Sequence, residues 1–329
     1  MDVASRVPRL RQAFAGAECD ALLVTRLVNI RYLTGFTGSA GLLLVLPDRA
    51  VLVSDGRYAT QAVEQTAAVG VDAAVEIAGA ADQRALVSGL VGRPGRLGLE
   101  AAHVSWARQR AFATDWFGGA ELIPTVGVVE GLRLVKDAGE LDRLGRAAAI
   151  ADAALASMRA RLEDGPTEEE FGQELDTEMR RRGATGPSFE TIVASGPNAA
   201  KPHHRPTDRQ IPAGEPVVLD FGALYDGYCS DMTRTVWVGA VADADLRRAV
   251  EVVLASQAAG VAAVRAGVGA AEVDAVCRSV IAEAGWADRF VHGTGHGVGL
   301  DIHEAPSVSA VSTDTLAAGQ VVTVEPGVY

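Results

Sequence analysis

Residues 217–236 read VVLDFGALYDGYCSDMTRTV, and this stretch predicts a β-hairpin that carries two acids. Runs of β-branched and aromatic residues flank Asp226-Gly227, a dipeptide that suits the positive φ angles of a hairpin turn. With a loop over residues 224–227, Asp220 lies opposite Asp231. Opposed Cβ atoms are ~5 Å apart, and two carboxylates so close repel unless a proton or a cation separates them. The hairpin therefore predicts a divalent-cation site; two solvated acids on an exposed face, or a turn cap, are the alternatives.

A second segment, FVHGTGHGVGLDIHEAP at residues 290–306, contains His292, His296 and His303, three of the six histidines in the chain. Neutral imidazole binds transition metals and also transfers protons near neutral pH, so both roles are open. The interleaved glycines let the backbone approach a ligand closely. Core packing does not require this concentration of histidine, so the segment is predicted to be functional.

Two shorter segments add candidate residues. The polar loop PHHRP at residues 202–206 holds His203 and His204, with an ordinary surface loop as the alternative. The run VVTVEPG at residues 321–327 places Glu325 at the end of a predicted apolar strand, directly before a Pro-Gly turn. An acid leaving a buried strand needs a partner, and a metal ion is the partner we expect.

Together these motifs resemble the pita-bread metallopeptidases, the family of Xaa-Pro aminopeptidases, Xaa-Pro dipeptidases (prolidases) and methionine aminopeptidases. The PHH loop, the IHEAP segment and a separate amino-terminal half resemble the proline-specific branch, and the resemblance covers essentially the whole chain. It implies a mixed α/β (α+β) fold. A creatinase/prolidase-like α/β domain is expected over residues 1–131, followed by a pseudo-two-fold pita-bread catalytic domain over residues 132–329 that is incomplete at its C-terminal end.

The resemblance also implies a two-metal site with four ligands in this sequence: Asp220, Asp231, His296 and Glu325. Asp231 would bridge both ions. Three histidines would line the substrate site, orienting the scissile carbonyl and stabilising charge: His203, His292 and His303. Glu325 would also pass a proton from the attacking water to the leaving proline nitrogen. His204 is expected to be only a neighbour of the site.

The implied reaction is hydrolysis of the Xaa-Pro bond, at the N-terminus of peptides or in dipeptides, by attack of a metal-bridging hydroxide on the carbonyl. Mn²⁺ is the favoured metal for the two positions, with Co²⁺ and Zn²⁺ as alternatives. The expected partners are short peptides or dipeptides with proline second, and a second copy of the chain in a homodimer. The rival interpretations are a pita-bread binding or scaffold protein without catalysis, and a metal-free hydrolase resembling creatinase.

One departure from the family pattern concerns the fifth ligand, a bridging glutamate that the resemblance places beyond the VEPG turn. The sequence stops at Tyr329 without reaching it. The chain is expected to be a truncated fragment of a longer protein, and a natural variant with an incomplete site is the alternative.

Composition agrees with a two-domain enzyme. A chain of 329 residues exceeds the usual size of a single core. Its net charge of −12 argues against nucleic-acid binding. Three scattered cysteines, no signal peptide and no apolar stretch long enough to span a bilayer predict a cytoplasmic protein. Cys229 is predicted to share a strand face with Asp231, as a buried hydrophobe rather than a metal contact.

Hydrophobic periodicity predicts alternating elements in the amino-terminal half. The predicted elements are helices over residues 3–15, 58–64 and 104–112, and strands over residues 21–25, 41–46, 50–54 and 97–99. Asp55 is expected to begin a helix rather than form a site. After a boundary near residues 132–137, helices are predicted over residues 140–162, 167–182, 246–264 and 271–284. Thr167 and Glu170 form a predicted capping box, and Lys136 is expected to pair with Glu140.

Overall fold

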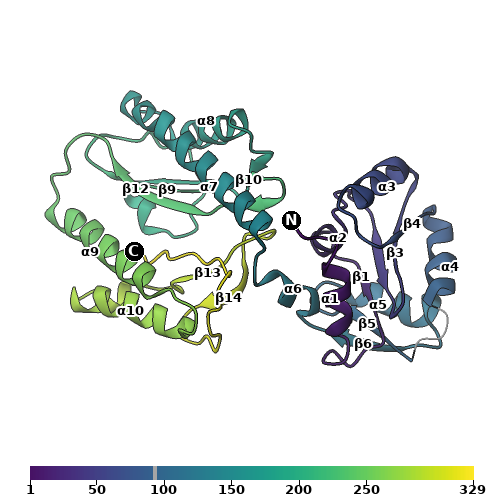
Figure 1. The fold of residues 1–329 in the computed structure, drawn as a ribbon. Coiled ribbons are helices and arrows are strands. Elements are labelled where there is room, and N and C mark those ends of the chain that lie inside the picture. Colours follow the sequence, from purple (N-terminus) through teal and green to yellow (C-terminus); the bar gives the residue numbers. More distant parts are fainter. Residues whose placement is uncertain (92–94) are drawn as a thin grey trace. The chain divides into compact units, whose positions relative to one another are not determined.

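The computed structural model describes residues 1–91 and 95–329, and the chain divides into two compact units, Met1–Arg133 and Leu134–Tyr329. The first unit is coloured purple to blue in Figure 1, and the second teal to yellow. Within the described residues, no helix is both long and apolar enough to cross a bilayer.

The first unit is built on a six-stranded sheet in the order β4-β3-β2-β1-β5-β6 (Figure 1). Its strands are β1 (Ala21–Val24), β2 (Leu42–Val45), β3 (Ala50–Ser54), β4 (Ala74–Ile77), β5 (Arg96–Glu100) and β6 (Glu121–Thr125). β2 and β3 confirm the strands predicted over residues 41–46 and 50–54, and they pair antiparallel. β1, β5 and β6 run parallel, so their carboxyl ends meet at one edge of the sheet.

Six α-helices of the described residues accompany this sheet: α1 (Arg6–Gln12), α2 (Leu27–Thr34), α3 (Ala59–Ala68), α4 (Ala80–Val91), α5 (Trp106–Ala111) and α6 (Val128–Arg133). α1 is shorter than the predicted helix because the chain turns over residues 13–19, where Glu18 has a φ of 53°. The Asp55 side chain accepts a hydrogen bond from the Arg57 backbone N–H at 3.0 Å, which confirms its predicted place at a helix start.

In the second unit, a helix pair precedes the first strands. The helices are α7 (Ala138–Met158) and α8 (Glu168–Arg181), and the strands are β7 (Gly186–Pro187), β8 (Ile192–Ser195), β9 (Pro216–Phe221), β10 (Ala223–Tyr225), β11 (Tyr228–Cys229) and β12 (Met232–Trp237). The strands form two small sheets, β12-β9-β8 and β11-β10-β7. The predicted capping box of Thr167 and Glu170 is present, and α8 packs Phe171 and Leu175 into the core beside Leu219 of β9.

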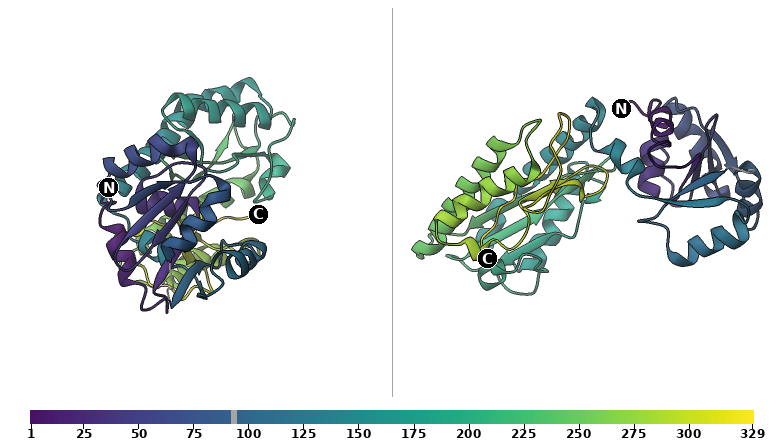
Figure 2. Two further views of the ribbon diagram at one scale, coloured as in Figure 1. Left: turned by 90° about the vertical axis from the view of Figure 1, so that its right-hand side faces the viewer. Right: turned by 90° about the horizontal axis from the view of Figure 1, so that it is seen from below.

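A second helix pair and a second set of strands follow. These are α9 (Ala244–Ala263), α10 (Ala270–Glu283), β13 (Gly295–Gly297) and β14 (Glu304–Val308). α9 and α10 lie side by side in green in Figures 1 and 2. Two rounds of a helix pair followed by strands are the arrangement expected of a pseudo-two-fold pita-bread domain, and the predicted fold class is confirmed.

The predicted register of the acidic hairpin is wrong by two residues. Asp226 and Gly227 both have positive φ, 44° and 80°, and form a two-residue turn rather than the predicted four-residue loop. Asp220 therefore pairs with Thr233 and not with Asp231. Asp231 becomes a diagonal neighbour, and such residues share a face of the sheet at ~7–8 Å.

Three smaller predictions are also corrected. Lys136 pairs with Glu304 at 3.1 Å rather than with Glu140, whose carboxylate accepts from Tyr228 and completes the N-terminal cap of α7. Residues 321–324 form an isolated bridge at Val322 instead of a regular strand. Cys229 lies in β11 and Asp231 lies outside that strand, so they do not share a strand face, although Cys229 is buried as predicted.

Candidate metal centre

Three predicted ligands converge in the second unit. One ligand atom from each of Asp231, His296 and Glu325 lies within 4.8 Å of the other two. His296 Nε2 is 3.3 Å from Asp231 Oδ2 and 3.2 Å from Glu325 Oε1. Within residues 1–91 and 95–329, this is the one group of at least three such side chains that is close enough to hold an ion.

Backbone pairing between two distant segments brings His296 to Glu325. The Thr323 N–H donates to the His296 carbonyl at 2.8 Å, and the Glu325 N–H donates to the Thr294 carbonyl at 2.8 Å. Gly295 permits this approach, because a Cβ there would overlap the carbonyl oxygen of Thr323; Gly297 likewise permits the close approach of Ala305 in β14. The glycines that flank His296 are therefore required by packing.

The neighbours of His296 fix its ring. Its Nδ1 lies 2.9 Å from the Gly297 carbonyl, which can only accept, so Nδ1 carries a hydrogen and Nε2 faces Asp231 and Glu325. Burial lowers the pKa of His296, but the hydrogen bonds to the two carboxylates outweigh it and raise the pKa to about 10. Without a cation, a proton takes the place between the imidazole and the acids.

Asp220 adds a further negative charge to the same region. Burial, and then the charge of Asp231, raise the pKa of Asp220 to about 7, although the Thr233 hydroxyl donates to it at 2.9 Å. Burial also raises the pKa of Glu325, but hydrogen bonds from His296 and Thr323 lower it overall. The carboxylates of Asp220, Asp231 and Glu325 thus have few hydrogen-bond donors among them.

This donor set fits divalent cations. Carboxylate oxygens and an imidazole nitrogen with a fixed tautomer are ligands that Mn²⁺, Co²⁺ and Zn²⁺ accept. A bound cation would favour the ionised form of Asp220 and would take the place of the proton that His296 otherwise holds. Ligand type alone does not select among these metals.

Two of the three predicted substrate-site histidines contact this region. The His303 ring packs edge-on against the His296 ring, with centroids 4.4 Å apart. The Nδ1 of His292 faces the Gly293 carbonyl at 2.7 Å, so in the neutral ring Nε2 accepts from the Tyr329 hydroxyl at 3.2 Å. No local sequence pattern singles out Tyr329, whose pKa is raised to about 12 by burial and by the charges of Asp220 and Glu325.

The third histidine, His203, lies on an exposed loop and makes no hydrogen bond or ring contact with the described residues. Its neighbour His204 is buried and lies 2.9 Å from a carboxylate oxygen of Glu168. Glu168 is fully buried, and sequence reasoning missed its role because nothing local distinguishes it from the exposed Glu169.

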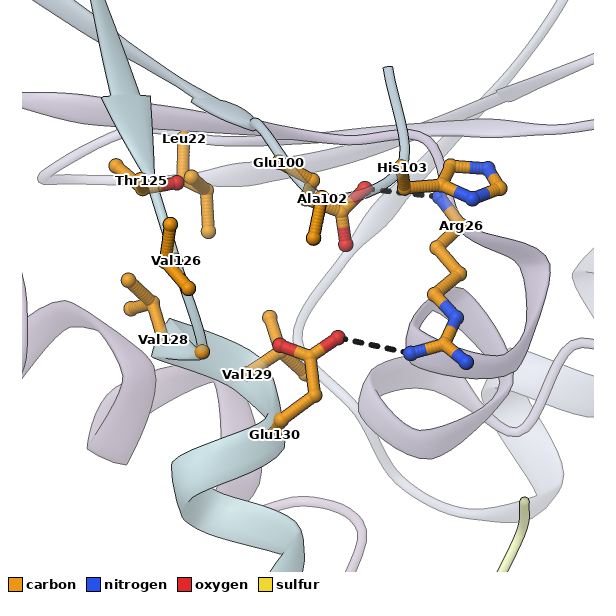
Figure 3. A pocket seen from close by; sticks show the side chains of 11 residues that line it. Leu22, Arg26, Glu100, Ala102, His103, Thr125, Val126, Val128, Val129 and Glu130 are labelled. Carbon is orange, nitrogen blue, oxygen red and sulfur yellow. Dashed lines mark hydrogen bonds and ion pairs between the residues drawn. The ribbon is translucent and has the colours of Figure 1, made fainter. Parts of the chain in front are cut away.

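The first unit contains a pocket of another kind, with a volume of about 340 Å³ (Figure 3). It lies at the carboxyl ends of β1, β5 and β6 and is lined by Arg26, Glu100, His103 and Glu130 among others. Asn29 donates to both carboxylates at 2.7 Å, and Arg26 pairs with Glu130 at 3.1 Å. The chain's own donors satisfy these acids.

A mixed α/β pita-bread fold with a carboxylate and histidine cluster between its halves defines a metallohydrolase. Comparison with known proteins gives the family: Metallopeptidase family M24 matches residues 142–329, and the Creatinase/Prolidase N-terminal domain matches residues 6–135. The chain belongs to metallopeptidase family M24 and is a peptidase.

Individual relatives agree along the whole chain. An uncharacterized peptidase of Bacillus subtilis, YqhT, is 40% identical over 324 residues, which are 98% of this chain and 90% of the relative. The solved Xaa-Pro dipeptidase from Bacillus anthracis has a TM-score of 0.93 and 40% identity, covering 99% of this chain and 90% of that one. The X-Pro aminopeptidase from Thermotoga maritima has a TM-score of 0.88 and 32% identity, covering 97% and 90%.

Proposed function

We propose that this protein is a dinuclear-metal exopeptidase that hydrolyses the bond between a first residue and a proline. The observation that carries the proposal is the convergence of Asp231, His296 and Glu325 from three segments of the chain, with one ligand atom of each within 4.8 Å of the other two. The names of the similar structures, Xaa-Pro dipeptidase and X-Pro aminopeptidase, support the substrate class. Proline suits a dedicated enzyme because its tertiary amide and fixed ring differ from every other peptide bond.

Four side chains would hold the ions: Asp220, Asp231, His296 and Glu325. When bound, divalent ions lower the pKa of a water molecule and polarise the scissile carbonyl. Mn²⁺ is our first choice, because three of the four ligands are carboxylates. Relief of the charge repulsion around Asp220 would favour binding.

Glu325 would transfer the proton in this reaction, from the attacking water to the leaving group. Its pKa is lowered, so it is ionised near neutral pH, and the Thr323 hydroxyl donates to its Oε1 at 2.8 Å and fixes the carboxylate. It would accept a proton from the attacking water and deliver it to the proline nitrogen as the peptide bond breaks. The proton released by the nucleophile is thereby returned to the leaving group.

The histidines would bind and orient the substrate. His303, whose ring packs against that of His296, would donate to the oxygen of the scissile carbonyl as negative charge develops on it. His292 would contact the same group or the proline carboxylate once Tyr329 yields its hydrogen bond. We assign His203 to the same substrate site. A homodimer is proposed from the resemblance alone.

The test is hydrolysis of Ala-Pro and Ala-Pro-Ala by chelator-treated protein before and after addition of Mn²⁺, Co²⁺ or Zn²⁺, with Ala-Ala and Ala-Ala-Ala as controls. Metal-dependent release of alanine from the proline substrates alone is expected, and the preferred substrate separates dipeptidase from aminopeptidase action. Metal-independent hydrolysis would favour the creatinase-like alternative, and a folded, metal-loaded but inactive protein would favour a scaffold.

A further inference from the structure

The loop that carries His203 is anchored at both ends by one buried carboxylate. We call residues 195–207 the His203 loop; it follows β8 and includes the 3₁₀ turn Gly196–Ala200. Oε1 of Glu168 accepts from the backbone N–H of Ser195 at 2.7 Å and from the Ser195 hydroxyl at 2.8 Å. Its Oε2 accepts from the N–H of Thr207 at 3.1 Å and from the Thr207 hydroxyl at 2.8 Å. The two oxygens thus hold the two ends of the loop.

Two side chains inside the loop join the same carboxylate. The Asn198 amide donates to Oε1 of Glu168 at 3.0 Å. His204 Nε2 lies 2.9 Å from Oε2, and an ionised carboxylate is an acceptor only, so His204 is the donor. His203 therefore lies directly beside an anchored residue, with its own side chain exposed.

The carboxylate stays charged in this position although it has no exposed surface. Burial alone would raise the pKa of Glu168, but the hydrogen bonds from Asn198, Ser195, His204 and Thr207 outweigh burial and lower it to about 2. Two backbone hydrogen bonds also join the first turn of α8 to the chain at the C-terminal end of the His203 loop. The Glu168 N–H donates to the Arg209 carbonyl, and the Glu169 N–H donates to the Thr207 carbonyl.

We infer that Glu168 is a positioning residue for His203, acting through the His203 loop to hold that imidazole in place for substrate. The inference rests on the proposed function, since it assigns His203 to the substrate site. A buried, ionised acid that collects hydrogen bonds from four residues of one loop holds the geometry of that loop, and groups that orient a functional residue typically change activity by ~10–100-fold when lost. Glu168 itself touches no substrate.

The test is a double-mutant cycle on kcat and KM for Ala-Pro-Ala, with Glu168→Gln and His203→Ala singly and together. Glu168→Gln is expected to lower kcat/KM by ~10–100-fold and to reproduce the division between kcat and KM seen for His203→Ala. In the His203→Ala background, Glu168→Gln should lower kcat/KM by less than about twofold, because the imidazole that Glu168 positions is absent. Equal losses in both backgrounds would overturn the inference, and so would an unchanged Glu168→Gln enzyme.

Three variants serve as controls. Glu169→Gln makes the same chemical change one residue away on the exposed surface and should leave kcat/KM within about twofold of wild type. Glu168→Asp keeps the charge and should recover part of the activity. If Glu168→Gln does not fold, Asn198→Ala replaces it in the cycle, because it removes one donor and keeps the carboxylate.

Hydrogen exchange gives a readout independent of activity. The amides of Ser195 and Thr207 donate to Glu168, so their exchange should accelerate at least tenfold in Glu168→Gln while that of β9 is unchanged. Wild-type protein that hydrolyses no proline substrate would count against the proposed function alone. Unchanged exchange of both amides in Glu168→Gln would count against the positioning role alone.

Discussion

The two units each bring acids together, and the two groups differ in their supply of hydrogen-bond donors. In the first unit, Glu100 accepts from Thr25, Arg26 and Asn29. Burial raises the pKa of its neighbour Glu130, but hydrogen bonds from Asn29 and Arg26 lower it overall.

The candidate metal centre of the second unit has the opposite character. Among the described residues, Thr233 is the one side chain that donates to Asp220, and the pKa of Asp220 is raised to about 7 by burial and by the charge of Asp231. The supply of hydrogen-bond donors, not the number of acids, therefore distinguishes the structural cluster from the candidate cation site. Carboxylates that accept enough hydrogen bonds from the chain itself do not require a cation.

Removal of a predicted metal ligand should have the largest effect, a loss of activity that the first-unit acids do not share. His296→Ala deletes the imidazole between Asp231 and Glu325 and should lower kcat/KM by about 10³-fold, since metal ions supply several kcal/mol of transition-state stabilisation. Glu100→Gln is the matched control and should leave kcat/KM within about twofold. Steady-state kinetics of both variants test this prediction. Equal losses of kcat/KM would show that the two acidic groups do not differ in function.

The pH dependence of stability should be next in size. In chelator-treated protein the folded-state pKa of Asp220 lies above its ordinary value of 3.8, so the native state binds the extra proton and stability falls as pH rises from about 4 to 7. The three-unit difference corresponds to about 4 kcal/mol at most. Urea unfolding of wild type and Asp220→Asn across this range tests it. A wild-type slope that survives in Asp220→Asn would show that Asp220 is not its source.

Glu168, an acid rich in donors, should have the reverse pH dependence. Its folded-state pKa of about 2 lies below the ordinary 4.5, so its contribution is fully present above pH 4.5 and is lost as pH falls toward 2. About 3 kcal/mol is expected from the shift. The free energies of unfolding of wild type and Glu168→Gln at pH 6, 4.5 and 3 measure this contribution. The same pH dependence of stability in both proteins would contradict it.

Loss of charge in the first-unit group should have the smallest effect. Glu100→Gln leaves one or more of its donors, among them the N–H groups of Thr25 and Arg26, without an acceptor, at a cost of ~1–3 kcal/mol. Thermal unfolding should show this loss, while bound metal should be unchanged. A fall in metal content would mean that the two acidic groups are not functionally distinct.

The sequence predicted those features whose cause is local. Thr167 and Glu170 cap α8 because the capping box needs only four adjacent residues, and Asp226-Gly227 turns the hairpin for the same reason. The partner of Asp220 was predicted wrongly, because a two-residue and a four-residue turn fit the same dipeptide.

Long-range contacts were beyond local reasoning. The approach of His296 to Glu325 depends on pairing between segments about 27 residues apart, and the motif resemblance, not any local pattern, indicated it. Glu168 was missed because its partners lie 27 to 39 residues further along the chain. A buried acid is visible only once the fold shows which donors surround it.

Equilibrium dialysis of Mn²⁺ against wild type, Asp231→Ala and Glu100→Gln shows whether the second-unit acids bind a cation and the first-unit acids do not. Asp231→Ala is expected to weaken Mn²⁺ binding by ~10–100-fold or more, while Glu100→Gln is expected to bind Mn²⁺ as wild type does. Equal Mn²⁺ affinity of wild type and Asp231→Ala would contradict this prediction.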